Sequence, residues 1–97
     1  MNVACIVYDG KNYPILECWE SYTGWYWFIL KRYPDTEDIT FGYVVGFEKE
    51  FGDIDMLELR AQRKKGACWM VPKANWFSVS YAKMIDPQKE KLETEIS

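Results

Sequence analysis

A chain of 97 residues has room for a single domain with one core, and none of its apolar stretches reaches the roughly 20 residues that a membrane-spanning helix needs. Five Trp, seven Tyr and five Phe supply the large side chains that so small a core requires. The sequence contains no histidine, the side chain most often used for general base catalysis and for binding transition metals, so the composition argues against both kinds of site.

The cysteines Cys5, Cys18 and Cys68 are odd in number and show no C-x-x-C spacing. We expect all three to be reduced thiols, buried as small apolar side chains, with no metal ion and no other cofactor. The first residues, Met1 to Cys5, lack a basic segment followed by a long apolar one. This predicts a cytoplasmic protein that makes no membrane contact.

The net charge of −3 is distributed unevenly along the chain. Residues 1–59 carry eleven acids and four bases, residues 60–85 six bases and no acid, and residues 86–97 four acids and two bases, for net charges of −7, +6 and −2. This pattern predicts surfaces of both signs that a charged partner can meet. The alternative is that these charges are only solvated loops and helix ends.

Asp9-Gly10 predicts a tight turn near the N-terminus, because a type I′ turn needs positive φ at both central residues. The turn would join a strand from Val3 to Tyr8 with a second strand from Lys11 to Trp19. Pro14 cannot donate a ladder hydrogen bond, so the second strand should lie at a sheet edge or be bulged there. Glu20 to Gly24 would follow as a loop.

The segment from Gly24 to Phe47 predicts a β-hairpin. Its aromatic run, Trp25 to Leu30, is separated from a second apolar run, Ile39 to Phe47, by the turn Tyr33 to Asp38. Pro34 fixes φ in this turn and the acidic side chains can accept local backbone hydrogen bonds, so both strands should end there. The first strand is apolar on both faces and therefore needs cover on both sides.

The second strand of this hairpin places Gly42 and Gly46 on one face, where they would leave a shallow trough. We expect a ring from the neighbouring strand, that of Trp25, Tyr26 or Trp27, to lie across the trough as part of the core. The alternative is that the trough admits the backbone of a partner or a flat ligand.

The strongest helix signal in the chain begins at Asp55. Asp55 and Glu58 form a capping box, and Ile54 before the cap can contact Leu59 as a hydrophobic staple. We predict a helix from Met56 to Lys65 that is ended by Gly66. Its three inward apolar residues would be Met56, Leu57 and Leu59.

The remaining segments complete the predicted fold. Glu48 to Asp53 is predicted to be a polar turn, Ala67 to Val71 a short strand, and Trp76 to Tyr81 a last strand. Residues 86–97 would form a tail or a short C-terminal helix. The prediction is thus a single α+β domain over residues 1–85, an antiparallel sheet of five to six short strands with one helix packed on one face.

The central part of the chain, Ile15 to Leu59, resembles a known family. The motifs are Trp25-Tyr26-Trp27-Phe28, then Phe41-Gly42-Tyr43-Val44 with Gly46-Phe47-Glu48, then Glu50-Phe51-Gly52 leading into Leu57-Glu58-Leu59. They are similar to the W-x-W-Y, FG-x-V-x-G-F-E and E-L-G-Y-x-S-L-x-E-L motifs of an uncharacterised family of small proteins from bacteria, phages and plasmids. The resemblance implies the same fold and a phage or mobile-element setting. It implies no activity, because the family has none assigned.

A catalytic role has little support in the sequence. The cysteines lie in apolar strand patterns, where burial raises the pKa of a thiol. Ser78, Ser80 and Lys83 match a serine–lysine arrangement only through a spacing that chance often produces. We therefore expect a non-enzymatic protein.

Our preferred hypothesis is an accessory module that binds a protein partner by covering a basic surface with acidic loops. Acidic side chains next to aromatic ones define the candidate patch: Trp19, Glu20, Tyr22, Tyr33, Asp35, Glu37 and Asp38. An open sheet edge would also permit a homo-oligomer.

The alternative hypothesis is single-stranded nucleic-acid binding through residues 60–81, with bases contacting phosphates and aromatic rings stacking on nucleobases. Its candidates are Arg60, Arg63, Lys64, Lys65, Trp69, Lys73 and Trp76. The acidic sequence pI of about 4.9 argues against it, and the bases at the end of the predicted helix also suit the helix dipole.

Overall fold

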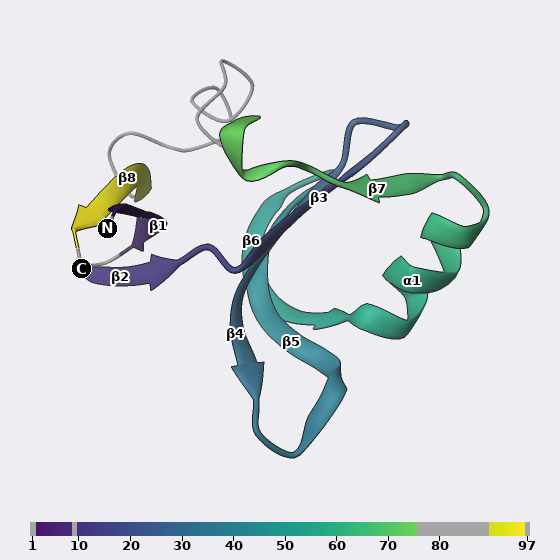
Figure 1. Ribbon diagram of the computed structural model, residues 1–97, viewed down its shortest axis with the longest axis horizontal. Coiled ribbons are helices and arrows are strands. Elements are labelled where there is room, and N and C mark those ends of the chain that lie inside the picture. Colours follow the sequence, from purple (N-terminus) through teal and green to yellow (C-terminus); the bar gives the residue numbers. More distant parts are fainter. Residues whose placement is uncertain (1, 9, 76–89, 97) are drawn as a thin grey trace.

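The structure is a computed structural model that describes residues 2–8, 10–75 and 90–96. Its elements are β1 (Asn2–Tyr8), β2 (Lys11–Pro14), β3 (Glu17–Ser21), β4 (Tyr26–Tyr33), β5 (Thr36–Val45), β6 (Lys49–Asp55), α1 (Met56–Lys64), β7 (Cys68–Met70), a 3₁₀ turn η1 (Lys73–Asn75) and β8 (Glu90–Ile96). The strands form a five-stranded antiparallel sheet in the order β6-β5-β4-β3-β7 and a smaller sheet in the order β2-β1-β8. The predicted α+β class, an antiparallel sheet with one helix packed on it, is confirmed (Figure 1).

The predicted central hairpin is present as β4 and β5, paired from Tyr26 opposite Val45 to Tyr33 opposite Thr36. Its turn is shorter than expected, because β5 already begins at Thr36. Only Pro34 and Asp35 remain between the strands, so the fixed φ of proline lies where the chain reverses.

Each face of the large sheet carries a core of its own, as the two-sided apolar pattern of β4 requires. The core next to the small sheet contains Ile6, Ile15, Cys18, Tyr26, Phe28, Leu30, Tyr43, Val45 and Val71. The core next to the helix contains Trp19, Ile29, Ile54, Met56, Leu59 and Cys68. Figure 1 shows the small sheet and α1 on opposite sides of the large sheet.

Helix α1 begins at Met56 as predicted and ends at Lys64, one residue before the predicted end. The Asp55 carboxylate caps it by accepting hydrogen bonds from the backbone N–H groups of Leu57 and Glu58, at 3.0 and 3.3 Å. Leu57 was predicted to pack on the sheet but is 56% exposed. Each residue turns the helix by roughly 100°, so Leu57 points away from the face that buries Met56 and Leu59.

The predicted polar turn from Glu48 to Asp53 is wrong, because Lys49–Asp55 forms strand β6. Its backbone pairs with β5 from Lys49 opposite Val45 to Asp55 opposite Ile39. The strand lies at the edge of the large sheet, so it needs few apolar side chains and its polar composition resembles that of a turn.

The predicted strand from Lys11 to Trp19 is divided into β2 and β3, which belong to different sheets. The chain crosses between the sheets at Ile15 and Leu16, directly after Pro14. Pro14 ends β2, which is an edge strand of the small sheet, so the expected edge position is confirmed.

Residues 90–96 form strand β8, antiparallel to β1, where the sequence predicted a tail or a short helix. The spacing of Leu92 and Ile96 does not distinguish the two structures, because residues four apart share a face in a strand as well as in a helix. The end of the chain therefore belongs to the small sheet. The predicted strand from Trp76 to Tyr81 lies outside the described residues.

Gly42 of β5 and Gly46, which directly follows β5, have close neighbours. A Cβ at Gly46 would lie 2.5 Å from the ring of Trp25, so an aromatic ring covers this part of the trough as predicted. A Cβ at Gly42 would overlap the backbone oxygen of Phe28 and lie 2.5 Å from Cδ1 of Ile54. The trough is therefore filled by core packing.

We expect Gly42→Ala to lower the free energy of unfolding by about 1–3 kcal/mol, because the backbone of Phe28 must move to admit the methyl group. Gly52 is the matched control, since it pairs directly opposite Gly42 and has no heavy atom within 4 Å of its Cβ position. Gly52→Ala should not lower the stability. Urea unfolding of both variants measures the difference, and equal losses would contradict the packing at Gly42.

Candidate functional site

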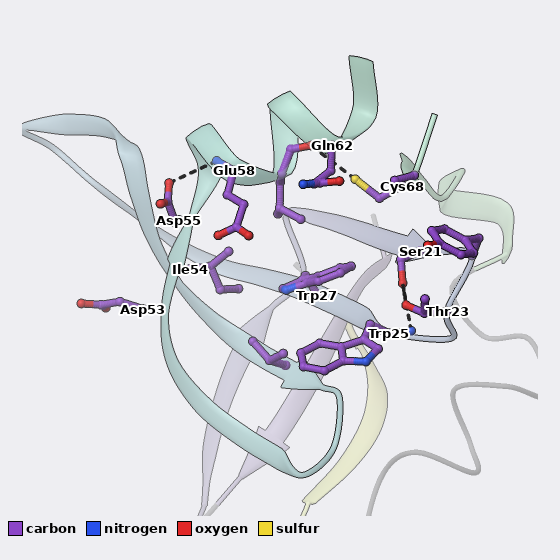
Figure 2. A pocket seen from close by; sticks show the side chains of 14 residues that line it. Ser21, Thr23, Trp25, Trp27, Asp53, Ile54, Asp55, Glu58, Gln62 and Cys68 are labelled. Atoms are coloured by element: carbon purple, nitrogen blue, oxygen red, sulfur yellow. Dashed lines mark hydrogen bonds between the residues drawn. The ribbon is translucent and has the colours of Figure 1, made fainter. Parts of the chain in front are cut away.

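A cleft of about 560 Å³ lies beside helix α1 on the inner face of the large sheet. Trp27 of β4 and Trp25 just before it line the sheet side, and Glu58, Leu59 and Gln62 line the helix side. Figure 2 shows the two indole rings below the helix. The other lining residues are Ser21, Tyr22, Thr23, Val44, Asp53, Ile54, Asp55, Ala67 and Cys68.

Local geometry explains why these residues meet. Trp27 lies opposite Trp19 of β3 and opposite Val44 of β5, and residues directly opposite one another share a face of the sheet. Glu58 and Gln62 are four residues apart and share a face of α1. From the sequence, Glu58 was expected only to take part in the helix cap, and Gln62 was not singled out. The available signal was this polar pair at helical spacing on either side of the buried Leu59.

Aromatic side chains at one end of the cleft are exposed. The ring of Phe47 meets that of Trp25 edge-on at 5.2 Å, and the rings of Trp25 and Trp27 are 6.0 Å apart. Phe47 is 95% exposed and Tyr22 is 76% exposed. Phe47 was predicted to belong to the second strand of the hairpin, but β5 ends at Val45 and leaves it outside. We call Tyr22, Trp25 and Phe47 the aromatic end.

The charged residues that border the cleft are all acidic among the described residues: Asp53, Asp55 and Glu58. Asp55 caps the helix, and Asp53 accepts a hydrogen bond from the Tyr33 hydroxyl at 2.7 Å and points away from the indoles in Figure 2. The Glu58 carboxylate makes no hydrogen bond or ion pair with any described residue, and it is directed from the helix toward the sheet (Figure 2). The cleft therefore presents the Glu58 carboxylate, without a basic neighbour among the described residues, beside two indoles.

Cys68 lines the inner part of the cleft, where its thiol donates a hydrogen bond to the Leu59 carbonyl at 3.3 Å. Burial raises the pKa of the Cys68 thiol, and the charge of Arg63 opposes that rise only in part. The thiolate is the reactive form, so this environment does not activate the residue as a nucleophile. Ser78, Ser80 and Lys83 lie outside the described residues.

All three cysteines are buried thiols outside any disulfide, as predicted. We expect an aromatic disulfide reagent to label none of them rapidly at neutral pH and to label all three after unfolding without reductant. Because the raised pKa of Cys68 means that the folded state holds this proton more tightly, the stability it contributes should fall as pH rises past the ordinary thiol pKa. Rapid labelling before unfolding, or a missing thiol afterwards, would contradict the burial or the free state.

The predicted acidic and aromatic patch is divided between the two ends of the large sheet. Trp19 is only 2% exposed, with the guanidinium of Arg63 at 5.8 Å from its ring, so its prediction as a surface anchor is wrong. Glu20 accepts hydrogen bonds from the Tyr26 hydroxyl and the Trp69 indole, at 2.6 and 3.3 Å. Tyr22 belongs to the aromatic end.

The other predicted patch residues, Tyr33, Asp35, Glu37 and Asp38, lie at the opposite end of the sheet, around the turn between β4 and β5. Because β3 and β4 are antiparallel, the loop after β3 and the turn after β4 must lie at opposite ends. Tyr33, Asp35 and Glu37 line a second cleft of about 450 Å³ there.

The described candidates for nucleic-acid binding are distributed over α1, β7 and η1, and several of them already contact other residues. Arg60 donates to the Glu37 carbonyl at 3.0 Å and lies 3.8 Å from the Asp38 carboxylate, while Arg63 covers Trp19. Trp69 donates to Glu20. Lys64 and Lys65 are exposed at the end of α1 and Lys73 is exposed in η1, whereas Trp76 lies outside the described residues.

Comparisons with protein-family models, with curated proteins and with solved structures found no match to this chain. The resemblance of the strand motifs to the phage and plasmid family therefore stays a prediction. Within the described ranges, no helix is long and apolar enough to cross a membrane. In the same ranges, no group of three or more Cys, Asp or Glu residues is placed to hold a metal ion.

Proposed function

We propose that this protein is a non-enzymatic binding module that contacts a protein partner through the aromatic end and the cleft beside it. The observation that carries the proposal is Phe47, which is 95% exposed yet rests edge-on against Trp25. Exposed aromatic side chains that cluster beside a concave surface are typical anchors of protein interfaces.

The charge of this surface favours a basic partner. Glu58 faces the cleft, and no basic residue lines it among those described. A complementary field steers association and discriminates against acidic proteins and nucleic acids. The resemblance to small proteins of phages and plasmids supports an accessory protein of a mobile element, acting in the cytoplasm. A second contact that we propose is pairing between two copies of this chain along an edge of the large sheet.

Binding of single-stranded nucleic acid is less favoured, because several of the required groups already have partners within the molecule. Arg60 is bound to the acidic turn, and Trp69 donates to a carboxylate that would repel a phosphate backbone. Arg63 lies over Trp19, whose ring is buried and cannot stack on a nucleobase.

Affinity capture from a lysate of the source organism tests the proposal with three immobilised proteins: the natural protein, Phe47→Ser and Leu57→Ser. Leu57 is the matched control, because it is 56% exposed but does not line the cleft. The natural protein and Leu57→Ser should recover the same protein, and Phe47→Ser should lose it without a change in melting temperature.

Two outcomes would overturn the proposal. One is recovery of the same protein by Phe47→Ser. The other is tight binding of a single-stranded oligonucleotide near physiological salt with no protein recovered, which would favour the basic segment instead.

A further inference from the structure

A row of tryptophans crosses the helix-facing side of the large sheet. Trp19 lies directly opposite Trp27, and the ring of Trp25 is 6.0 Å from that of Trp27. The first ring of the row already carries a cation, because the guanidinium carbon of Arg63 lies 5.8 Å from the Trp19 ring. In the described part of the chain, no Arg or Lys side chain lies over Trp25 or Trp27.

Polar groups on α1 face these two partly exposed indoles. Figure 2 shows that the side chains of Glu58 and Gln62 project from the helix toward the sheet. Neither side chain makes a hydrogen bond with a described residue. A carboxylate that borders an aromatic surface without a counter-charge is most stabilised by a cation that contacts the rings and the carboxylate together.

We propose that the cleft binds an arginine side chain of the protein partner, with its guanidinium on the rings of Trp27 and Trp25 and the Glu58 carboxylate as counter-charge. The inference rests on the proposed function and specifies the chemistry of the partner. The side-chain amide oxygen of Gln62 would accept a further hydrogen bond from an N–H group of the guanidinium. Ile54 and Val44 would contact the methylene groups of the arginine side chain.

Arginine fits this site better than lysine. A guanidinium is planar, weakly hydrated and rich in donors, so it stacks on an indole while its edge reaches a carboxylate. The ammonium group of lysine is strongly hydrated and is not planar. Its contact with an indole ring is therefore less favourable than that of a guanidinium, which can stack on the ring. An apolar side chain would bury Glu58 without a partner, which is unfavourable.

The test uses three synthetic peptides, acetyl-Gly-Ser-X-Ser-Gly-amide, with arginine, lysine or citrulline at X. Citrulline keeps the shape of arginine but is uncharged. The readout is the NMR signals of the tryptophan indole N–H groups. We expect the arginine peptide to shift the Trp25 and Trp27 signals, the lysine peptide to bind several-fold more weakly, and the citrulline peptide to cause no shift.

Two matched variants locate the counter-charge. Glu58→Gln should weaken binding of the arginine peptide about tenfold while keeping the helix cap, because the Asp55 carboxylate makes that cap and the Glu58 carboxylate takes no part in it. Asp35→Asn makes the same change of charge at the far turn and should leave the affinity unchanged. The melting temperatures of both variants show whether they stay folded.

The outcomes separate this inference from the function on which it rests. Equal affinity for arginine and lysine, no shift with arginine, or no effect of Glu58→Gln would overturn the arginine site, even if capture of the partner still required Phe47. Arginine binding that depends on Glu58, with capture unaffected by Phe47→Ser, would support the arginine site and overturn the aromatic end as the partner's contact.

Discussion

Phe28→Ala should lower the free energy of unfolding by about 3–5 kcal/mol. Phe28 is completely buried in the core between the two sheets, and its ring lies 6.1 Å from that of Tyr43. It belongs to β4, the central strand of the large sheet, so the neighbouring strands cannot collapse freely onto the space left by the ring. A small domain has a total stability of roughly 5–15 kcal/mol, so a large share of it would be lost.

Phe47→Ala provides the matched control for this effect. The same side chain is removed, but from a position that is 95% exposed, so the stability should change by no more than about 0.5 kcal/mol. Chemical denaturation followed by tryptophan fluorescence compares the two variants. Similar losses at the two positions would be incompatible with this core.

Leu59→Ala should cost about 2–5 kcal/mol, because Leu59 is 4% exposed and joins α1 to the core that contains Ile54 and Met56. The Leu59 backbone carbonyl also accepts the hydrogen bond of the Cys68 thiol, so loosening this turn of the helix should speed the labelling of Cys68. The two readouts, unfolding free energy and labelling rate, should change together.

Leu57→Ala is the control on the same helix, where the side chain is 56% exposed. The loss of stability should be within about 0.5 kcal/mol, with no change in the labelling of Cys68. A larger loss at Leu57 than at Leu59 would mean that the helix packs through its other face.

The helix and the central hairpin could be predicted because their signals are local. Asp55 at the N-cap and Gly66 after the last turn define α1, and Pro34 defines the reversal between β4 and β5. Such signals depend on backbone preferences and hydrogen bonds within a few residues, so they are legible in the sequence.

The elements that were predicted wrongly depend on partners distant in the chain. Lys49–Asp55 is polar and becomes a strand because β5 supplies its backbone hydrogen bonds. Residues 90–96 pair with β1 at the other end of the chain. Neither pairing can be recognised from the local composition, because a strand that is hydrogen-bonded to neighbouring strands needs little β-strand propensity of its own.

The sequence predicted the kinds of residue that form the candidate site, but not their arrangement. It indicated a protein-binding surface built from acidic and aromatic side chains, and Tyr22 was among the predicted residues. It did not indicate that α1 leaves Trp25 and Trp27 partly exposed, that Glu58 faces them, or that β5 ends before Phe47. The first two facts follow from where the helix lies on the sheet, and the third from where the pairing of β5 with β4 and β6 ends. Both depend on contacts between residues distant in the chain.

The most direct test of the proposed partner surface is site-specific photo-crosslinking in a lysate of the source organism. A photoreactive phenylalanine analogue is placed at Phe47, and in separate proteins at Leu57 and Lys64, which are exposed on α1. We predict one discrete protein adduct from position 47 and no adduct from positions 57 and 64. Excess unlabelled natural protein should diminish the adduct. The same excess of a competitor that carries Phe47→Ser should leave the adduct undiminished. An adduct that forms from position 57 or 64 and not from position 47 would contradict the account.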